Sequence, residues 1–308
     1  MSQPAISKDQ IHAIWRAHSL GRIHSIEPIP AGSRNLAYYI NSDLVLRVNT
    51  LDPQFKKFSN EKSALDQLDL FGLPVPQVIF LDESRRLVPH DLIVLTRLPG
   101  ASIAESKGSL RPEELNSLAA ESGRALAALH QLSFDRFGDF AGLQRNPFST
   151  WREFFLDYAG RYLADARGAS LLSPAQSEQL DEILEEAAPL LDEVRQAVFI
   201  HSDYHYENIL QQNGELSGLL DFEWAYAGDP ASDFVPVDER RRVLPGSEKA
   251  FIQGYLETRS FDESFSRRVA LYRLFLDLED AVTCRRLGDV RGEAEAIANL
   301  DQQLRGWE

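Results

Sequence analysis

The part of the sequence that decides the fold is Val198-Phe199-Ile200-His201-Ser202-Asp203-Tyr204-His205-Tyr206-Glu207-Asn208, followed shortly by Leu219-Leu220-Asp221-Phe222-Glu223. The apolar run Val198–Ile200 ends abruptly in polar residues, which is typical of a buried strand that delivers its next residues to a surface. Asp203 and Asn208 should therefore lie on one loop.

A β-hairpin is expected directly after this loop. Ile209–Gln211 and Leu216–Leu220 flank Gln212-Asn213-Gly214-Glu215, and Asn-Gly is the strongest short hairpin signal. Because a hairpin brings its two ends together, Asn208 and Asp221 should be spatial neighbours. The sequence thus predicts that the oxygen-bearing side chains of Asp203, Asn208 and Asp221 converge.

These three side chains suit phosphoryl transfer. Mg²⁺ prefers oxygen ligands and takes few carboxylates from protein, because phosphates and water fill its other positions. A separate carboxylate must orient the attacking hydroxyl and accept its proton. Asp203 suits the base role, while Asn208 and Asp221 suit the metal. The neutral amide of Asn208 avoids a third negative charge beside the phosphates.

The remainder of the chain divides at Pro99-Gly100. Before it, short strands mix with a few helices; after it, long helical patterns dominate. We therefore expect an α+β protein with an N-terminal lobe over residues 1–98 and a mostly helical lobe over residues 99–308. Helices are expected over residues 8–19, 54–71, 112–129, 151–167, 174–194, 247–258, 266–287 and 290–306. N-terminal strands are expected at Ile23–Pro28, Ala37–Ile40, Leu44–Asn49, Val78–Asp82 and Leu92–Leu98.

Composition restricts the function and the compartment. The chain has 308 residues, a net charge of −15 and a single cysteine, Cys284. Nucleic-acid binding is disfavoured because no Lys/Arg cluster supplies a basic footprint, and the short Arg240–Arg242 run is offset by Asp238 and Glu239 before it. No apolar run is long enough to span a membrane, and one cysteine permits no internal disulfide, so we expect a soluble cytoplasmic protein. The acidic balance either draws a cationic substrate or only keeps the surface soluble.

The pattern His-x-Asp-x-x-x-x-Asn followed by Leu-Leu-Asp-Phe-Glu resembles the catalytic and metal-binding motifs of the aminoglycoside phosphotransferase/choline kinase-like family, a relative of the protein kinases. Gly228–Phe234 is similar to the segment that follows in that family. The resemblance runs from about residue 25 to 235 and implies a two-lobed, protein-kinase-like fold with a small mixed β-sheet lobe.

The same resemblance implies the nucleotide-binding residues. Gly32, Ser33, Arg34 and Asn35 are similar to the family's loop over the nucleotide phosphates. Arg47 lies where a strand supplies a basic phosphate contact, and Glu61 lies where a helix supplies the carboxylate that holds it. Two departures are notable: Arg47 replaces the lysine of many relatives, and a guanidinium holds phosphate differently from an ammonium. The loop also contains one glycine only.

The implied activity is transfer of the γ-phosphoryl group of ATP or GTP, with Mg²⁺, to a hydroxyl of a small acceptor. Six residues separate Asp221 from Gly228, and no Ala-Pro-Glu follows. This leaves no long activation segment of the kind that binds peptides in protein kinases, so a small-molecule acceptor is favoured. The acceptor itself, the nucleotide preference and the oligomeric state are not encoded in a recognisable pattern.

Alternatives remain at this point. Asp203, Asn208 and Asp221 are also common turn residues. Because His201, Asp203 and His205 alternate, they could together bind Zn²⁺ or Mn²⁺, with Asp221 as a fourth ligand, in a metal-dependent hydrolase. A non-catalytic, nucleotide-binding pseudokinase is the other alternative. For single residues, we expect His130 in the core and Asp233 in a structural role, whereas His205 is open between a surface position, which is favoured, and a substrate contact.

Overall fold

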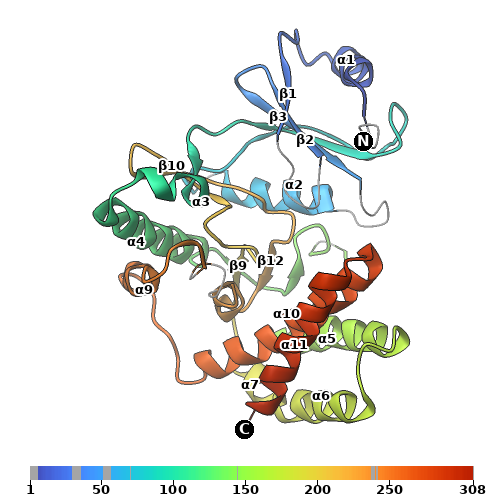
Figure 1. The fold of residues 1–308 in the computed structure, drawn as a ribbon, viewed down its shortest axis with the longest axis vertical. Coiled ribbons are helices and arrows are strands. Elements are labelled where there is room, and N and C mark those ends of the chain that lie inside the picture. The colour runs from blue at the N-terminus through green and yellow to red at the C-terminus, as the bar shows by residue number, and fades with distance from the viewer. Residues whose placement is uncertain are drawn as a thin grey trace. The chain divides into compact units, whose positions relative to one another are not determined.

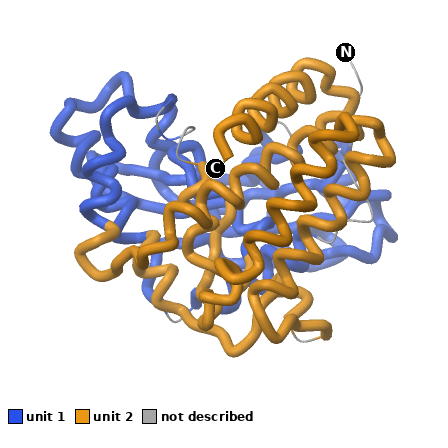
Figure 2. Tube along the Cα trace, turned by 90° about the horizontal axis from the view of Figure 1, so that it is seen from below, with its two compact units in different colours: residues 1–125, 203–225, 240–254 blue, residues 126–202, 226–239, 255–308 orange. Residues whose placement is uncertain are grey.

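The structure is a computed structural model that describes residues 6–29, 36–50, 57–69, 71–143, 145–236, 240 and 242–307. Its residues form two compact units that are interleaved in the sequence (Figure 2). Unit 1 consists of Met1–Ala125, Asp203–Ala225 and Arg240–Gly254, and unit 2 of Leu126–Ser202, Tyr226–Glu239 and Tyr255–Glu308. The lobe boundary at residues 98 and 99 stays a prediction.

A five-stranded antiparallel sheet dominates unit 1 (Figure 1). Its strand order is β1-β2-β3-β5-β4, and every pairing along it is antiparallel. The strands are β1 (Ile26–Pro28), β2 (Leu36–Ile40), β3 (Leu44–Asn49), β4 (Val78–Asp82) and β5 (Asp91–Thr96). The strand run predicted at Leu44–Asn49 is therefore confirmed in full.

Side-chain alternation along β3 explains how this sheet positions a charged residue. Leu46 and Val48 point to the face that packs against helix α1 (Lys8–Ala17), where they join a buried cluster with Ile14. Because successive side chains of a strand point to opposite faces, Arg47 points to the other face. Helix α2 (Lys57–Leu68) covers that face and packs against β4 and β5.

The rest of unit 1 contains the predicted hairpin and the helices around it. Strands β10 (Ile209–Gln212) and β11 (Glu215–Leu219) pair with each other, and β10 also pairs with β6 (Ala101–Ser102). Gly100 allows this approach: its φ is +102°, and a Cβ there would lie 2.2 Å from the carbonyl oxygen of Gln211. The helical elements are α3 (Ile103–Ser106), the 3₁₀ turn η1 (Lys107–Ser109), α4 (Pro112–Leu129) and α9 (Glu248–Leu256), and the last residues of α4 and α9 belong to unit 2.

Unit 2 is mostly helical. A small antiparallel sheet has the order β7-β9-β12-β8, and α10 packs against α5, α11 and the turn η2. The elements of this unit are β7 (Ser133–Phe134), β8 (Gly138–Asp139), α5 (Trp151–Gly168), α6 (Pro174–Glu186), α7 (Ala188–Asp192), β9 (Ala197–Ile200), β12 (Tyr226–Gly228), η2 (Pro230–Phe234), α10 (Phe265–Leu287) and α11 (Val290–Arg305).

One helix prediction was wrong. The single helix expected over residues 174–194 is two helices, α6 and α7, which meet at Ala187. Pro189 lies in the first turn of α7, where it needs no intrahelical donor, whereas inside one continuous helix its ring would clash with the preceding turn. The α+β class is confirmed. Across the described part of the chain, no helix is both long and apolar enough to cross a membrane.

Candidate active site

Hydrogen bonds hold the backbone in place at the start of the loop that carries Asp203. The buried carboxylate of Asp233 accepts hydrogen bonds from the backbone N–H groups of His201 (2.9 Å) and Ser202 (2.6 Å). The φ of Ser202 is +71°, a left-handed conformation that is costly for a residue other than glycine. His130 lies within 3.0 Å of Asp233 and 2.8 Å of the Tyr255 hydroxyl, fully buried. The structural role predicted for Asp233 and the core position predicted for His130 are confirmed.

Tyr204 fixes the loop on the other side of Asp203. Its ring is buried, and its hydroxyl donates to the carbonyl oxygen of Ser122 in α4 at 2.7 Å. The buried guanidinium of Arg240 donates to the Tyr204 carbonyl oxygen at 2.6 Å and lies over the ring of Phe251. The residue that follows the predicted base is therefore held by both its side chain and its backbone.

The side chains of the loop converge as predicted. The Asn208 amide nitrogen donates to Oδ2 of Asp203 at 2.9 Å and to its backbone carbonyl at 3.0 Å. Since both partners are acceptors, the amide nitrogen must face them, and Oδ1 of Asn208 is turned away for another ligand. His205 also belongs to this group, because its Nε2 lies 3.1 Å from Oδ1 of Asp203. The surface position favoured for His205 was wrong, because only 13% of its side chain is exposed.

The hairpin brings Asp221 to this loop. Asn213 and Gly214 have φ values of +56° and +84°, as the two-residue turns typical of Asn-Gly require. Ile209 pairs with Leu219, and the Leu220 N–H donates to the Asn208 carbonyl oxygen at 2.9 Å. Asp221 therefore follows directly after the backbone partner of Asn208, and its side chain is 32% exposed.

Arg47 binds Asp221 and two further carboxylates. Its Nη1 donates to both oxygens of Glu61, at 2.6 and 2.9 Å, and its Nη2 donates to Asp221 at 2.9 Å and to Glu223 at 2.6 Å. Burial opposes the charge of Arg47, but Asp221, Glu61 and Glu223 together raise the pKa of the guanidinium above its ordinary value. The contact of Arg47 with Glu61 that the family resemblance implies is thus present. The same guanidinium also contacts Asp221, the predicted metal ligand.

Burial lowers the pKa of a guanidinium but raises the pKa of a carboxyl group such as that of Glu61. It raises the pKa of Glu61 to about 7, although the adjacent guanidinium of Arg47 favours the ionised carboxylate. Burial also lowers the pKa of Lys57, against the attraction of Glu223, whose Oε1 lies 3.4 Å from Nζ. This network is therefore a dense set of buried charges whose protonation depends on what binds there.

Sequence reasoning did not single out three members of this network. Glu223 bridges Arg47 and Lys57, and Asn60 donates to the backbone carbonyls of Glu223 (3.1 Å) and Ala225 (2.8 Å). Lys57, Asn60 and Glu61 have the i, i+3, i+4 spacing of one helix face. This spacing, and the position of Glu223 two residues after Asp221, are the sequence signals that could have identified these residues.

The donor set of Asn208 and Asp221 fits Mg²⁺. It consists of a neutral amide oxygen and a carboxylate, both of the hard type that this ion prefers, and few protein ligands suffice when nucleotide phosphates complete the shell. Across the described ranges, no group of three or more His, Cys, Asp or Glu side chains could hold a metal ion. His201, Asp203 and His205 therefore do not form the ligand cluster on which the hydrolase alternative depended.

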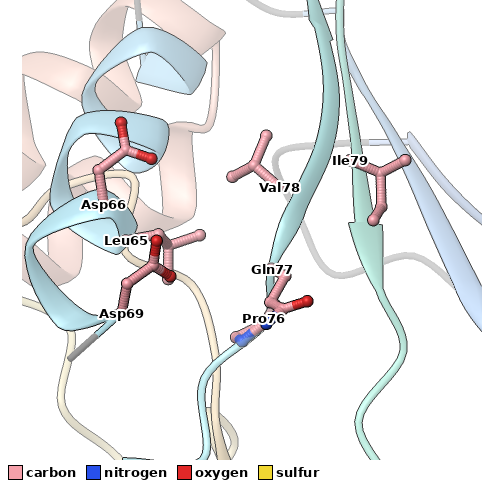
Figure 3. Close-up of a pocket in the computed structure, with 7 residues that line it drawn as sticks. All are labelled: Leu65, Asp66, Asp69, Pro76, Gln77, Val78 and Ile79. Carbon is pink, nitrogen blue, oxygen red and sulfur yellow. The ribbon is translucent and has the colours of Figure 1, made fainter. Parts of the chain in front are cut away.

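Gly32, Ser33 and Asn35 lie outside the described residues, so their predicted phosphate contacts stay predictions. A hollow of about 400 Å³ lies between α2 and β4, with Asp66 and Asp69 on the helix side and Gln77 on the strand side (Figure 3). None of the residues that line it belongs to the network around Arg47 or to the loop of Asp203.

Curated proteins similar in sequence are small-molecule kinases by name. Hygromycin-B 4-O-kinase of Escherichia coli is 25% identical over 239 residues, which cover 76% of this chain and 66% of that protein. Homoserine kinase of Beijerinckia indica subsp. indica is 24% identical over 233 residues, which cover 71% of this chain and 65% of that protein. The match thus spans about two thirds of the length of these relatives.

Solved structures show the fold. The gentamicin–APH(2")-IIa complex matches with a TM-score of 0.74 at 16% identity, covering 98% of this chain and 97% of that one. Aminoglycoside phosphotransferase APH(4)-Ia matches with a TM-score of 0.71 at 18% identity, covering 98% and 100%. The predicted protein-kinase-like architecture, with a β-sheet N-lobe and a helical C-lobe, is confirmed. Residues 25–265 match the phosphotransferase enzyme family, and since this is most of the sequence, the chain belongs to that family.

Proposed function

We propose that the protein is a small-molecule kinase that transfers the γ-phosphoryl group of ATP or GTP to an acceptor hydroxyl. The observation that carries this proposal is the convergence in unit 1 of Asp203 with Asn208, and of Asp221 with Arg47. One carboxylate is held by the amide of its own loop, and the other lies beside a buried cation. These are the groups that phosphoryl transfer requires.

In the proposed reaction, Asp203 orients the acceptor and takes its proton. The acceptor oxygen forms a bond to the γ-phosphorus, the bond from that phosphorus to the bridging oxygen breaks, and a nucleoside diphosphate leaves. Mg²⁺, held by Oδ1 of Asn208 and the carboxylate of Asp221, would neutralise charge on the phosphates. Arg47, fixed by Glu61, would hold the phosphates in place, so that positioning and charge stabilisation supply most of the rate.

The acceptor is proposed to be cationic. The net charge of −15 favours a positively charged partner. The cytoplasmic location expected from the single cysteine belongs to this proposal as well.

The test is Mg²⁺-dependent transfer from γ-labelled ATP and GTP to pooled acceptors, with amino-sugars and amino alcohols in one set and neutral sugars and nucleosides in another. We expect transfer to a cationic pool. Asp203→Asn keeps the shape of the side chain and is the matched control; it should retain nucleotide binding and lower kcat by roughly 10²–10⁴.

Each other outcome has a definite meaning. Near-normal turnover by Asp203→Asn would remove Asp203 from the base role. Transfer to neutral acceptors alone would contradict the cationic acceptor but not the kinase. Tight nucleotide binding without transfer to any pool would favour the pseudokinase alternative.

A further inference from the structure

His205 is bound on both sides of its ring. The backbone N–H of Glu207 donates to Nδ1 at 3.3 Å, and Nε2 lies 3.1 Å from Oδ1 of Asp203. A backbone N–H can only donate, so Nδ1 must be the unprotonated, accepting nitrogen. In a neutral imidazole the proton is then on Nε2, and Nε2–H donates to Asp203.

The neighbouring amide supports the same assignment. The Asn208 nitrogen lies 3.3 Å from Nε2, but its hydrogens are directed to the backbone carbonyl and Oδ2 of Asp203. In these contacts Asp203 is bound through both carboxylate oxygens, by His205 at Oδ1 and by Asn208 at Oδ2. Both donors come from the same short loop.

Such support matters because the side chain of Asp203 is otherwise accessible. It is 37% exposed, whereas the backbone before it is fixed by Asp233 and the residue after it by Arg240. A fixed backbone leaves the side-chain torsions of an exposed aspartate free to rotate, and misplacement of a reacting group by about 1 Å can cost on the order of 100-fold in rate. A donor on each oxygen holds the carboxylate in one rotamer.

From these contacts we propose that His205 is a positioning residue for the predicted base. Its Nε2–H fixes Oδ1 of Asp203, so that the carboxylate meets the acceptor hydroxyl in one orientation. This inference rests on the proposed kinase activity, because it assigns a role to His205 through Asp203. It requires a hydrogen-bond donor at the Nε2 position and no proton transfer by the ring.

The experiment compares His205→Leu, which removes the donor, with His205→Gln, whose amide nitrogen can reach the Nε2 position. With the acceptor found for the wild-type enzyme, we expect His205→Leu to lower kcat by about 10- to 100-fold, with KM for nucleotide and acceptor within twofold. His205→Gln should restore kcat to within about threefold of wild type. The melting temperature and the calorimetric nucleotide Kd of both variants report whether the fold and the nucleotide site are intact.

A second measurement does not depend on turnover. Long-range ¹H–¹⁵N spectra of the nucleotide-free protein, with the His205 signals identified by their loss in His205→Gln, should show a neutral ring with the proton on Nε2. A proton on Nδ1 would overturn the proposed contact even if the activity data agreed with it.

The kinetic outcomes are equally decisive. Wild-type kcat in both variants would show that Asp203 needs no donor from His205. A rise in acceptor KM alone would make His205 a substrate contact. An equal loss of kcat in His205→Leu and His205→Gln would mean that an amide donor cannot replace the imidazole, and this would overturn the positioning role. If the wild-type protein transfers no phosphate, the proposed function fails, whereas the spectra still decide whether His205 holds Asp203.

Discussion

Each unit contains a buried arginine bound to carboxylates, and the two sites differ in how completely their partners are enclosed. In unit 2, Arg268 donates to Asp229 at 2.6 Å, and Asp229 is fully buried. The other oxygen of Asp229 caps η2 by accepting from the Ala231 N–H, and the Tyr272 hydroxyl adds a further donor. In unit 1, Arg47 reaches two almost fully buried acids, Glu61 and Glu223, but also Asp221, which is 32% exposed.

The backbone conformation of Asp221, the partly exposed partner of Arg47, strengthens the contrast. Asp221 has a φ of +66°, a conformation that costs free energy in a residue other than glycine, whereas Asp229 has an ordinary extended conformation. Asp229 is thus an ordinary helix cap with every oxygen bound inside the protein. Asp221 is held in an unfavourable conformation that leaves part of its carboxylate accessible. The comparison indicates that an incompletely enclosed acid, rather than burial of an arginine, distinguishes a ligand-binding network from a structural one.

The largest expected effect is on stability, in unit 2. Asp229→Asn keeps the shape of the side chain but removes the charge opposite buried Arg268, so we expect the free energy of unfolding to fall by about 3 kcal/mol. The matched change in unit 1, Asp221→Asn, should alter it by less than about 1 kcal/mol, because asparagine tolerates a positive φ and Arg47 keeps Glu61 and Glu223. Urea denaturation of both variants measures these changes.

For nucleotide binding we expect the opposite, a larger effect of Asp221→Asn than of Asp229→Asn. Asp221→Asn is expected to weaken Mg²⁺-nucleotide binding at least about tenfold, measured by calorimetry, since it removes a carboxylate from the proposed metal site. Folded Asp229→Asn should bind nucleotide like the wild type. If Asp229→Asn were as stable as the wild type, or if Asp221→Asn lost only stability, the distinction between the two networks would be wrong.

The second effect depends on pH and concerns Glu61. Because burial raises the pKa of Glu61 from 4.5 to about 7, the folded state favours the protonated acid. That contribution is fully present below pH 4.5 and is lost as pH rises towards 7. Glu61→Gln cannot ionise, so its stability relative to the wild type should increase by about 2 kcal/mol between pH 5 and pH 7.

Glu114→Gln is the control for this measurement. Hydrogen bonds from Arg111 lower the pKa of Glu114, so the stabilisation by its carboxylate is present above pH 4.5 and should be similar at pH 5 and 7. Urea unfolding of the wild type and both variants at the two pH values gives the differences. A difference for Glu61→Gln that is equal at both pH values would show that Arg47 keeps Glu61 ionised throughout.

The two networks also show what the sequence could and could not predict. Local signals were sufficient for the hairpin, because Asn213-Gly214 specifies a turn and thereby brings Asn208 and Asp221 together. The contact of Arg47 with Asp221 joins residues 174 positions apart, and only the family resemblance connected that strand with the motif. Lys57 and Glu223 were not predicted because buried charges look like surface charges in a sequence until their partners are known.

The misjudgement of His205 has a similar origin. A histidine in a polar loop is ordinarily exposed, whereas here the loop folds back on itself and brings Glu207, Asn208 and Asp203 into contact with the ring nitrogens. Likewise, the break between α6 and α7 depended on one proline inside an otherwise continuous helical pattern. In both places the decisive interaction involves the backbone, which amphipathic periodicity does not report.

The smallest expected effect concerns Asp262, the second carboxylate partner of Arg268 in unit 2. Arg268 also binds Asp262, at 2.9 and 2.8 Å, but Asp262 is 57% exposed. Hydrogen bonds from Arg268 lower the pKa of Asp262, yet solvent screens so exposed a charge, and Asp229 alone neutralises the arginine. Asp262→Asn should therefore cost less than about 1 kcal/mol of unfolding free energy at pH 7, a small part of the loss in Asp229→Asn, and should leave kcat unchanged. A loss as large as that of Asp229→Asn in urea unfolding would mean that exposure is not what separates strong from weak partners of a buried arginine, and the same argument for Asp221 would then have to be abandoned.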